Sequence, residues 1–295
     1  MQKKILLTGG NGFIGKNIQE SFLAQKYEIV APRSFELNLA DTDAVDEFFR
    51  TRWFDAVLHA ATKPGHRNAK DPTRLFYTNT RMFENLARHC DKFGKLINFG
   101  SGAVYDTAAD NRLVTEDQIG RRCGEDEHSF CKYVIHQRIK ALPNAIDLNI
   151  FGIFGKYEDW EIRFISNAIC KTLFNLPITL RQNRRFSYLY VNDLMPILDY
   201  FITHDTTYKS YNITPNEETE LLSAAQIVQK LGGNNNEIRV ASSGYGLNYS
   251  GSNARLKDEI KTIQFTPFEQ AVAQLMSYYR QHQTEINRNL LLEDK

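Results

Sequence analysis

A glycine-rich turn near the start of the chain restricts the possible folds more than any other feature. The apolar run Ile5–Leu7 leads into Thr8–Gly15, which reads Thr-Gly-Gly-Asn-Gly-Phe-Ile-Gly, and Phe13–Ala24 follows with helical periodicity. A strand that ends in glycines and passes directly into a helix lets the backbone approach a pyrophosphate, whose charge then lies among the unpaired N–H groups of the helix N-terminus. We therefore expect the chain to begin with a dinucleotide-binding strand-turn-helix unit.

Each glycine of this turn has a separate part. Gly9 permits the tight turn, Gly12 allows the close approach of the ligand, and Gly15 lets the helix pack on the strand. The cofactor-binding residues predicted here are Gly9, Asn11, Gly12, Phe13, Ile14 and Gly15.

The first half of the chain alternates short apolar runs with helical stretches. The predicted strands are Ile5–Leu7, Glu28–Ala31, Ala56–Leu58, Lys95–Phe99 and Ile146–Ile150. The predicted helices between them are Thr42–Arg50, Pro72–Phe93 and Phe130–Leu142. This alternation predicts an α/β fold with a doubly wound, parallel Rossmann sheet, whose ligand crevice lies at the carboxyl ends of the strands.

The alternation stops after about residue 150, so we predict two domains. Residues 1–150 form the cofactor-binding Rossmann domain, and residues 151–285 form a smaller α/β substrate lobe, with a strand and a helix near 186–204 returning to the first domain. In this half we expect a segment at Trp160–Leu173, a strand at Pro177–Leu180, a basic turn at Arg181–Arg185, an aromatic strand at Phe186–Val191, and helices at Glu217–Gly232 and Pro267–His282. The polar tail 286–295 is predicted to be frayed.

The composition argues against several classes of protein. The 295 residues carry a formal net charge of +1, so no long-range field favours nucleic acid or an anionic membrane as a partner. No apolar run approaches the ~20 residues that a membrane helix needs, and the N-terminus leaves no room for a cleavable signal. The four cysteines have neither CxxC nor zinc spacing, so no metal site is predicted. We expect a cytoplasmic protein with reduced thiols.

Several further segments carry a resemblance to a known family. The chain resembles the extended short-chain dehydrogenase/reductases that modify nucleotide-activated sugars, over roughly residues 3 to 280. The matching segments are Thr8–Gly15, His59-Ala60-Ala61 closing the fourth strand, Asn79, Ser101–Tyr105, Lys132, Tyr190–Asp193 and Ser252–Leu256, and the Glu36–Leu39 stretch is most similar to relatives of GDP-L-fucose synthase. The resemblance implies that Leu39, His59, Ala60, Ala61, Asn79 and Lys132 contact the cofactor. It also implies a nucleotide-diphospho-sugar substrate and a homodimer built on two long helices that flank the sheet.

The residues after the second strand favour one form of the cofactor. An acid at this position would accept the ribose 2′-OH of NAD and repel a 2′-phosphate. The strand instead ends in Ala31-Pro32-Arg33-Ser34, which offers a guanidinium and a hydroxyl suited to a phosphate. We therefore expect NADP(H), bound in part by Arg33 and Ser34.

The resemblance also implies a proton-transfer set, and this chain departs from it at one position. The family uses a Ser or Thr, a Tyr, and a Lys four residues after the Tyr; Ser101 and Lys132 match, but the residue four before Lys132 is His128. Residues i and i+4 share a helical face, so His128 is expected beside Lys132. We predict Ser101, His128 and Lys132 as the catalytic residues. The alternatives are an altered or inactive site, or proton transfer by Tyr105 or by a water.

Two more departures narrow the chemistry that the resemblance implies. Fucose synthases epimerise the keto-sugar with a Cys and a His, but here the corresponding positions hold Ala103 and, approximately, Arg163. Reduction of a 4-keto group without epimerisation is the simpler expectation. The substrate-side residues predicted are Tyr105, Arg163, Arg184, Arg185 and Arg255, with Arg184 and Arg185 expected near the diphosphate.

These features together predict an NADPH-dependent reductase of a nucleotide-diphospho-4-keto-sugar that serves glycan or polysaccharide precursor synthesis. Two alternatives stay open: a catalytically silent protein that binds NADP(H) as a sensor or scaffold, and a nucleotide-sugar 4-epimerase. A 4,6-dehydratase is disfavoured because Gly102-Ala103 supplies no Asp-Glu pair beside Ser101.

Overall fold

The fold is built around a parallel sheet that contains most of the predicted strands. The structure is a computed structural model that describes residues 2–293, so residues 294–295 of the predicted tail lie outside it. In the described chain the central sheet has six strands in the spatial order β2 (Glu28–Val30), β1 (Lys4–Thr8), β3 (Phe54–His59), β4 (Phe93–Phe99), β6 (Ala145–Ile150) and β11 (Ser210–Ile213). All of these neighbouring strands pair in parallel. The predicted Rossmann-type sheet is confirmed.

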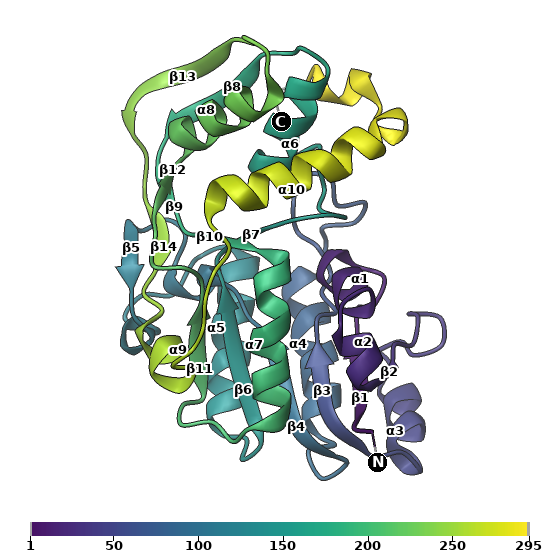
Figure 1. Ribbon diagram of the computed structural model, residues 1–295. Helices are drawn as coiled ribbons and strands as arrows, with labels where there is room; N and C mark the ends of the chain where they lie inside the picture. Colours follow the sequence, from purple (N-terminus) through teal and green to yellow (C-terminus); the bar gives the residue numbers. More distant parts are fainter. Residues whose placement is uncertain (1, 294–295) are drawn as a thin grey trace.

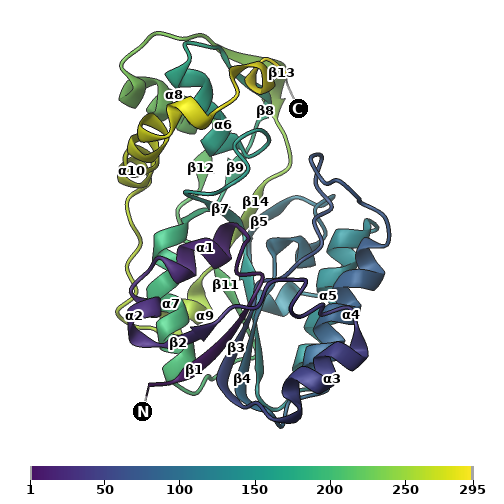
Figure 2. The same cartoon turned by 90° about the vertical axis from the view of Figure 1, so that its right-hand side faces the viewer.

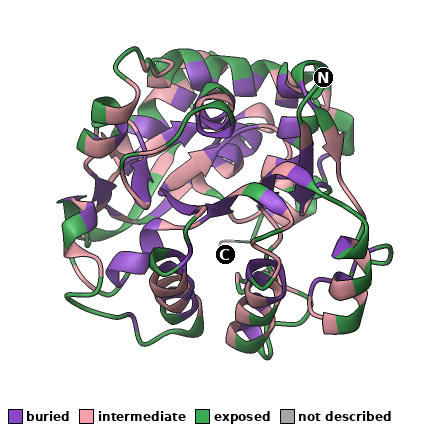
Figure 3. Cartoon of the chain, turned by 90° about the horizontal axis from the view of Figure 1, so that it is seen from below, coloured by how far each residue is buried: buried purple, intermediate pink, exposed green. Residues whose placement is uncertain are grey.

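Helices cover both faces of this sheet, as Figure 2 shows. The helices α1 (Phe13–Gln19), α2 (Leu23–Lys26) and α7 (Val191–Thr203) lie on one face, and α3 (Thr42–Arg50), α4 (Leu75–Ala87) and α5 (Glu127–Lys140) lie on the other. Side chains alternate between the faces along each strand. In β1, for example, Ile5 and Leu7 pack in the cluster on the α1 and α7 side, while Leu6 packs in the cluster on the α3 to α5 side. Figure 3 shows the resulting buried centre and exposed outer helix faces.

A second lobe stands above the carboxyl ends of the sheet strands (Figure 1). It contains α6 (Phe164–Leu173), α8 (Leu221–Gly232) and α10 (Phe268–Gln281), together with the parallel pair β8 (Ile178–Asn183) and β13 (Ile238–Tyr245). Two small sheets join the lobes: β12 (Thr219–Glu220), β9 (Arg185–Phe186), β14 (Tyr249–Gly251) and β5 (Asn111–Val114) form one, and β10 (Tyr188–Tyr190) and β7 (Gly152–Phe154) form the other. The short helix α9 (Ala254–Glu259) lies beside β11. The smaller C-terminal lobe is thus present as predicted.

Several element boundaries differ from the sequence-based expectations. The predicted helix Phe13–Ala24 is interrupted, because Ser21 bonds back to the carbonyl of Ile18 through both its backbone N–H and its hydroxyl. The helix predicted from Pro72 begins at Leu75, after Arg74 in a left-handed conformation (φ 54°). No strand forms over residues 31–41, so His59 ends the third strand in chain order rather than the fourth.

The predicted basic turn and aromatic strand are also rearranged. The basic residues Arg181 and Arg185 lie in β8 and β9, and the aromatic segment divides into β9, β10 and the start of α7. The strand from the second half that joins the central sheet is β11, whereas β10 pairs with β7. Helix α7 does return to the Rossmann domain.

The predicted fray of the C-terminal segment is wrong for the residues described. Residues Gln283–Glu285 (η3) and Arg288–Leu291 (η4) form 3₁₀ turns, and Ile286 and Leu291 are buried in the main hydrophobic cluster. Ile286 and Leu291 thus anchor this segment in the core. Separately, no helix among residues 2–293 is long and apolar enough to cross a membrane.

Candidate active site

A cavity of about 780 Å³ lies between the carboxyl ends of the sheet strands and the second lobe. The order of the central sheet reverses at β1, and such a switch point is where open α/β sheets bind ligands. The cavity brings together these predicted residues: Phe13, Ile14, His59, Ala60, Ala61, Asn79, Ser101, His128, Lys132, Arg163 and Arg184. Two groups that are far apart in sequence, one from each lobe, therefore share a single space.

The glycine-rich turn has the geometry that a dinucleotide requires. Gly9 has φ +72°, and a Cβ there would lie 2.6 Å from the backbone N of Ala61. A Cβ on Gly15 would lie 2.3 Å from the Gly9 carbonyl oxygen, so helix α1 packs this closely on the turn only with glycine at that position. A Cβ on Gly12 would meet only the Gly9 oxygen, at 3.3 Å, and would otherwise project into open space. No side chain caps α1, so its first N–H groups are available to a pyrophosphate. These residues fit a bound dinucleotide.

Buried polar side chains hold the floor of the cavity in place. His59, at the end of β3, shares a 2.8 Å hydrogen bond between its Nδ1 and the Thr8 hydroxyl. Burial and the nearby Lys132 lower the pKa of His59 to about 3, so its imidazole is neutral. On α4, Asn79 accepts a 2.7 Å hydrogen bond from the backbone N–H of Lys63 and donates to the carbonyl of the same residue. This bond ties the loop after β3 to the helix.

Ser101, His128 and Lys132 line one side of the cavity. Asp126 caps α5 by accepting a 2.9 Å hydrogen bond from the Ser129 N–H, which places His128 in the first turn of the helix. Lys132 follows one turn later, and its Nζ donates a 3.0 Å hydrogen bond to the carbonyl of Phe99 at the end of β4. The predicted pairing of His128 and Lys132 on one helical face is therefore present.

The electrostatics of this trio differ from those of free side chains. Burial, followed by the charge of Lys132, lowers the pKa of His128 to about 4, so the imidazole is neutral at pH 7. The partial positive charge of the helix N-terminus, where His128 lies, also lowers the pKa of this imidazole. Burial also lowers the pKa of Lys132, and no carboxylate among residues 2–293 forms a salt bridge with it. A neutral imidazole is a poor proton donor, so His128 is poorly suited to protonate the sugar oxygen.

Two arginines face the trio from the second lobe. Arg163 is the residue before α6, and Arg184 lies between β8 and β9; both line the cavity. Arg184 stacks 4.5 Å from the ring centre of Phe186, and its buried Nε has no hydrogen-bond partner among the described residues. Within residues 2–293 neither guanidinium forms a salt bridge, so both charges remain available to an anion. Guanidinium groups of this kind suit a diphosphate.

Seven predicted site residues with side chains do not line this cavity: Asn11, Arg33, Ser34, Leu39, Tyr105, Arg185 and Arg255. Arg185 turns away to pair with Glu220 at 3.0 Å and stacks on Tyr245. Leu39 is buried in the cluster between the sheet and helices α3 to α5. Arg33 and Ser34 lie on the surface after β2, and Arg255 belongs to a separate polar network. The side chains of Arg185 and Arg255 thus have protein partners outside the cavity, and that of Leu39 lies in the core. The predicted contacts of Arg185 and Arg255 with substrate and of Leu39 with the cofactor stay predictions.

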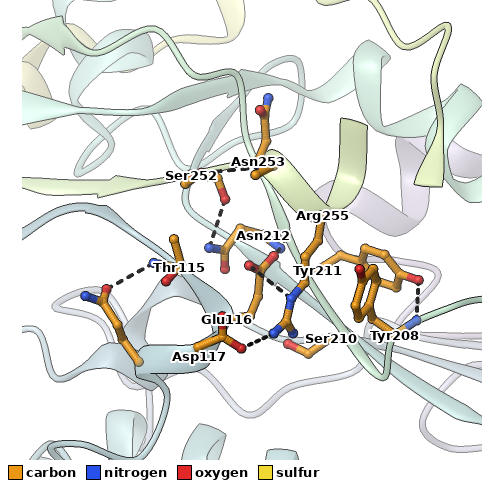
Figure 4. Close-up of polar contacts among 12 residues, drawn as sticks. Thr115, Glu116, Asp117, Tyr208, Ser210, Tyr211, Asn212, Ser252, Asn253 and Arg255 are labelled. Carbon is orange, nitrogen blue, oxygen red and sulfur yellow. Dashed lines mark hydrogen bonds and ion pairs between the residues drawn. The ribbon is translucent and has the colours of Figure 1, made fainter. Parts of the chain in front are cut away.

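The network around Arg255 joins three elements rather than binding a ligand (Figure 4). Arg255 hydrogen-bonds Asp117, lies 3.7 Å from the carboxylate of Glu116, and stacks on Tyr208. Glu116 in turn accepts a 2.7 Å hydrogen bond from the backbone N–H of Asn212 on β11. The network thus connects α9 and β11 to the 3₁₀ turn Glu116–Gln118 (η2).

Tyr105 is also a structural residue. It is only 5% exposed, its hydroxyl donates a 2.7 Å hydrogen bond to Asn212, and its ring stacks on Phe151. Burial is the main cause that raises its pKa. Tyr105 does not line the cavity, so this structure gives no support to the expectation that it contacts substrate or transfers the proton.

The cavity also contains residues that the sequence reasoning missed. The main ones are Glu158, Phe186, Tyr188 and Tyr249. Burial raises the pKa of Glu158 to about 8, and its carboxyl accepts a 2.5 Å hydrogen bond from Ser166. The alternation of Phe186 and Tyr188 along the aromatic segment is a signal that could have placed both on one face. No motif marks Tyr249.

Comparison with known proteins agrees with this geometry. Residues 5–214 match the NAD dependent epimerase/dehydratase family. The chain belongs to this family. Membership confirms the expected superfamily and explains the dinucleotide-binding turn and the mixed α/β fold.

The relatives include enzymes of GDP-sugar metabolism. The chain is 27% identical to a GDP-L-colitose synthase of Yersinia pseudotuberculosis over 69% of this chain and 73% of the relative. It is 33% identical to a GDP-L-fucose synthase of Azorhizobium caulinodans over 53% of this chain and 54% of that relative. The predicted likeness to GDP-L-fucose synthases is confirmed.

Solved structures share the fold across both lobes. A GDP-L-fucose synthetase from Naegleria fowleri superimposes with a TM-score of 0.83 at 18% identity, covering 96% of this chain and 95% of that one. A GDP-mannoheptose C4 reductase from Campylobacter jejuni, solved with NADP bound, superimposes with a TM-score of 0.81 at 17% identity, covering 95% and 98%. At these identities the likeness concerns the fold alone.

Proposed function

We propose that the protein is a reductase that uses NADPH to reduce the 4-keto group of a nucleotide-diphospho-sugar, as a step in the synthesis of a glycan or polysaccharide precursor. The observation that carries this proposal is the shared cavity, which joins a dinucleotide-binding turn, Ser101 and Lys132 on one lobe to two unpaired arginines on the other. A reductant and an anionic substrate would meet there.

Each group of residues then has a defined part. The dihydronicotinamide, when bound, supplies a hydride. Lys132 holds the ribose of the cofactor, and Ser101 donates a hydrogen bond to the carbonyl oxygen of the sugar. Arg163 and Arg184 bind the diphosphate, because both line the cavity and neither forms a salt bridge within residues 2–293.

Reduction without epimerisation is favoured because the two positions that would hold the epimerising residues carry side chains unsuited to proton transfer. Ala103 lines the cavity, and its methyl group transfers no proton. Arg163 lies near the position of the second epimerising residue, and a guanidinium, which has donors but no acceptor, is equally unsuited to that proton transfer. The named activities of the relatives support a GDP-linked substrate.

One observation favours a second candidate function. His128 occupies the position of the family tyrosine and is neutral at pH 7. The main alternative is therefore a catalytically silent protein that binds NADP(H).

The deciding experiment mixes the purified protein with NADPH and GDP-linked 4-keto-hexoses and follows the loss of NADPH absorbance. We expect turnover, with a product reduced at C4 and unchanged stereochemistry at C3 and C5 by NMR. NADPH binding without turnover on any 4-keto-sugar would leave the silent binder as the better description, whereas inversion at C3 or C5 would show an epimerising enzyme.

We further propose that the enzyme is a cytoplasmic homodimer that prefers NADP(H) over NAD(H). Four free cysteines suit a reducing compartment. Helices α4 and α5 pack on each other and leave Tyr77 and Phe130 exposed on the outside of the pair. Arg33 is exposed beside the expected adenosine ribose and forms no salt bridge within residues 2–293.

A further inference from the structure

The proposed reduction needs a proton for the sugar oxygen, and the usual donor position holds a neutral imidazole. Burial and Lys132 keep His128 uncharged at pH 7, so it has no readily released proton. Tyr105, four residues after Ser101 in the sequence, is buried outside the cavity. The proton must therefore come from another group that faces Ser101.

Tyr249 is such a group. It lies on β14, which contacts the 3₁₀ turn Gly102–Tyr105 that follows Ser101, and it lines the cavity together with Ser101. A sugar oxygen bound at the Ser101 hydroxyl would therefore lie next to the Tyr249 hydroxyl as well.

The surroundings of Tyr249 hold its phenol in this place. Its backbone carbonyl accepts a 3.1 Å hydrogen bond from Ser187, and its ring packs between Phe151 and Phe186 at centroid distances of 5.1 and 5.6 Å. A Cβ on Gly102 would lie 2.7 Å from the Tyr249 hydroxyl oxygen, so the glycine next to Ser101 makes the room that the phenol occupies. The side chain lines the cavity and is supported by tilted contacts with both neighbouring rings.

The charges around Tyr249 suit a proton donor. Burial raises the pKa of Tyr249 to about 12, so the phenol keeps its proton at pH 7. The Ser101 side chain and the charges of Arg163 and Arg184 oppose this rise in pKa, so they stabilise the phenolate that remains after transfer. An alkoxide is a stronger base than a phenolate, which makes the transfer favourable.

We propose that Tyr249 is the catalytic acid of this enzyme and donates its phenolic proton to the C4 oxygen of the keto-sugar. As hydride arrives from the dihydronicotinamide, the C4=O π bond breaks and a C–H bond forms. The O–H bond of Tyr249 breaks and a new O–H bond forms on the sugar. The phenolate then takes up a proton from solvent. This inference rests on the proposed reductase function.

The first test compares Tyr249→Phe with Tyr245→Phe. Tyr245 ends β13, the strand that precedes β14 in the chain. It is exposed and its hydroxyl bonds Glu220 outside the cavity, so Tyr245→Phe removes the same hydroxyl group away from the site. Because general acid catalysis typically contributes 10²–10⁴-fold, we expect Tyr249→Phe to lower kcat by about 100-fold or more. Its Kd for NADPH, measured by fluorescence, should stay as in the wild type. Retention of kcat within about threefold, when His128→Gln loses far more, would overturn the proposal.

A second test does not depend on turnover. With NADP⁺ bound, the wild type should bind a GDP-hexose that carries a 4-hydroxyl about tenfold more tightly than its 4-deoxy analogue, because the Tyr249 and Ser101 hydroxyls contact that oxygen. Tyr249→Phe should lose most of this difference by calorimetry, and Tyr245→Phe should keep it. Equal discrimination in the wild type and Tyr249→Phe would overturn the role of Tyr249. If the wild type turns over no 4-keto-sugar, the reductase function fails by itself, and this binding comparison still decides whether Tyr249 contacts the sugar.

Discussion

At the scale of single residues, burial decides which groups of the site carry charge. His59 and His128 are both neutral at pH 7 because burial and Lys132 lower the pKa of each imidazole, to about 3 and about 4. The basic side chains that remain for a diphosphate or a ribose in this cavity are Lys132, Arg163 and Arg184. The histidines contribute shape and hydrogen bonds.

Arg33 is the residue on which the choice of cofactor should depend. Replacing it by Asp would put a carboxylate where we expect the 2′-phosphate. A hydrogen bond to a charged group is worth about 1.5–3 kcal/mol, so Arg33→Asp should weaken NADPH binding at least about tenfold. NADH binding should change much less, and fluorescence titration measures both.

A suitable control for Arg33→Asp is Arg50→Asp, which makes the same charge change at the exposed end of α3. It should leave both cofactors unaffected. An equal loss of NADPH and NADH affinity in Arg33→Asp would contradict this role of Arg33.

At the scale of elements, α4 and α5 form one unit with an unpartnered outer face. An ion pair between Glu84 and Arg138 (3.0 Å) links them, and Phe76 stacks on Phe130 with 5.3 Å between ring centres. Tyr77 is 51% exposed and Phe130 is 42% exposed on this pair. Exposed aromatic side chains of this kind are typical of protein interfaces.

The proposed dimer should therefore depend on Tyr77. The wild type is expected to run at twice the chain mass in size-exclusion chromatography with light scattering, and Tyr77→Glu should shift it to the monomer, because the change places a charge in the interface. Phe22→Glu alters an aromatic side chain that is 45% exposed beside α2, on the other face of the sheet, and should stay dimeric. A monomeric wild type would remove the dimer proposal.

At the scale of the whole molecule, the two lobes share one hydrophobic core. The main cluster runs from β1 and β6 through α7 to α6, α8 and α10, and it includes Leu291 from the C-terminal segment. The position of the second lobe above the sheet, and with it the width of the cavity, therefore depends on this shared core, to which both β1 and the C-terminal segment contribute side chains.

Leu291→Ala tests this packing. The side chain is 1% exposed, and removing a buried leucine typically costs about 2–5 kcal/mol, so the free energy of unfolding in urea should fall by that amount. Its neighbour Leu292 is 57% exposed, and Leu292→Ala should change the same quantity by less than about 0.5 kcal/mol. Similar small effects of both changes would show that the C-terminal segment does not support the core.

Local sequence alone determined the Rossmann sheet, the dinucleotide turn and the pairing of His128 with Lys132. These features follow from the spacing of neighbouring residues: apolar periodicity for strands and helices, glycines at a turn with φ > 0, and i, i+4 positions on one helical face. Family resemblance added Ser101, Asn79 and the arginines Arg163 and Arg184, all of which line the cavity.

Only the tertiary structure decided which side chains face the ligand. Arg184 and Arg185 are adjacent in sequence, yet one enters the cavity and the other pairs with Glu220, because successive side chains of an extended segment point to opposite sides. For a related reason Tyr105, which was expected at the substrate, lies outside the cavity, whereas Tyr249, which the sequence analysis did not single out, lines it. The chain brings β14 against the Ser101 loop from almost 150 residues away, and no local pattern records a contact between segments so distant in sequence. The turn at Thr8–Gly15 is local and could be recognised from sequence, whereas the proton donor that we propose depends on how the two lobes meet.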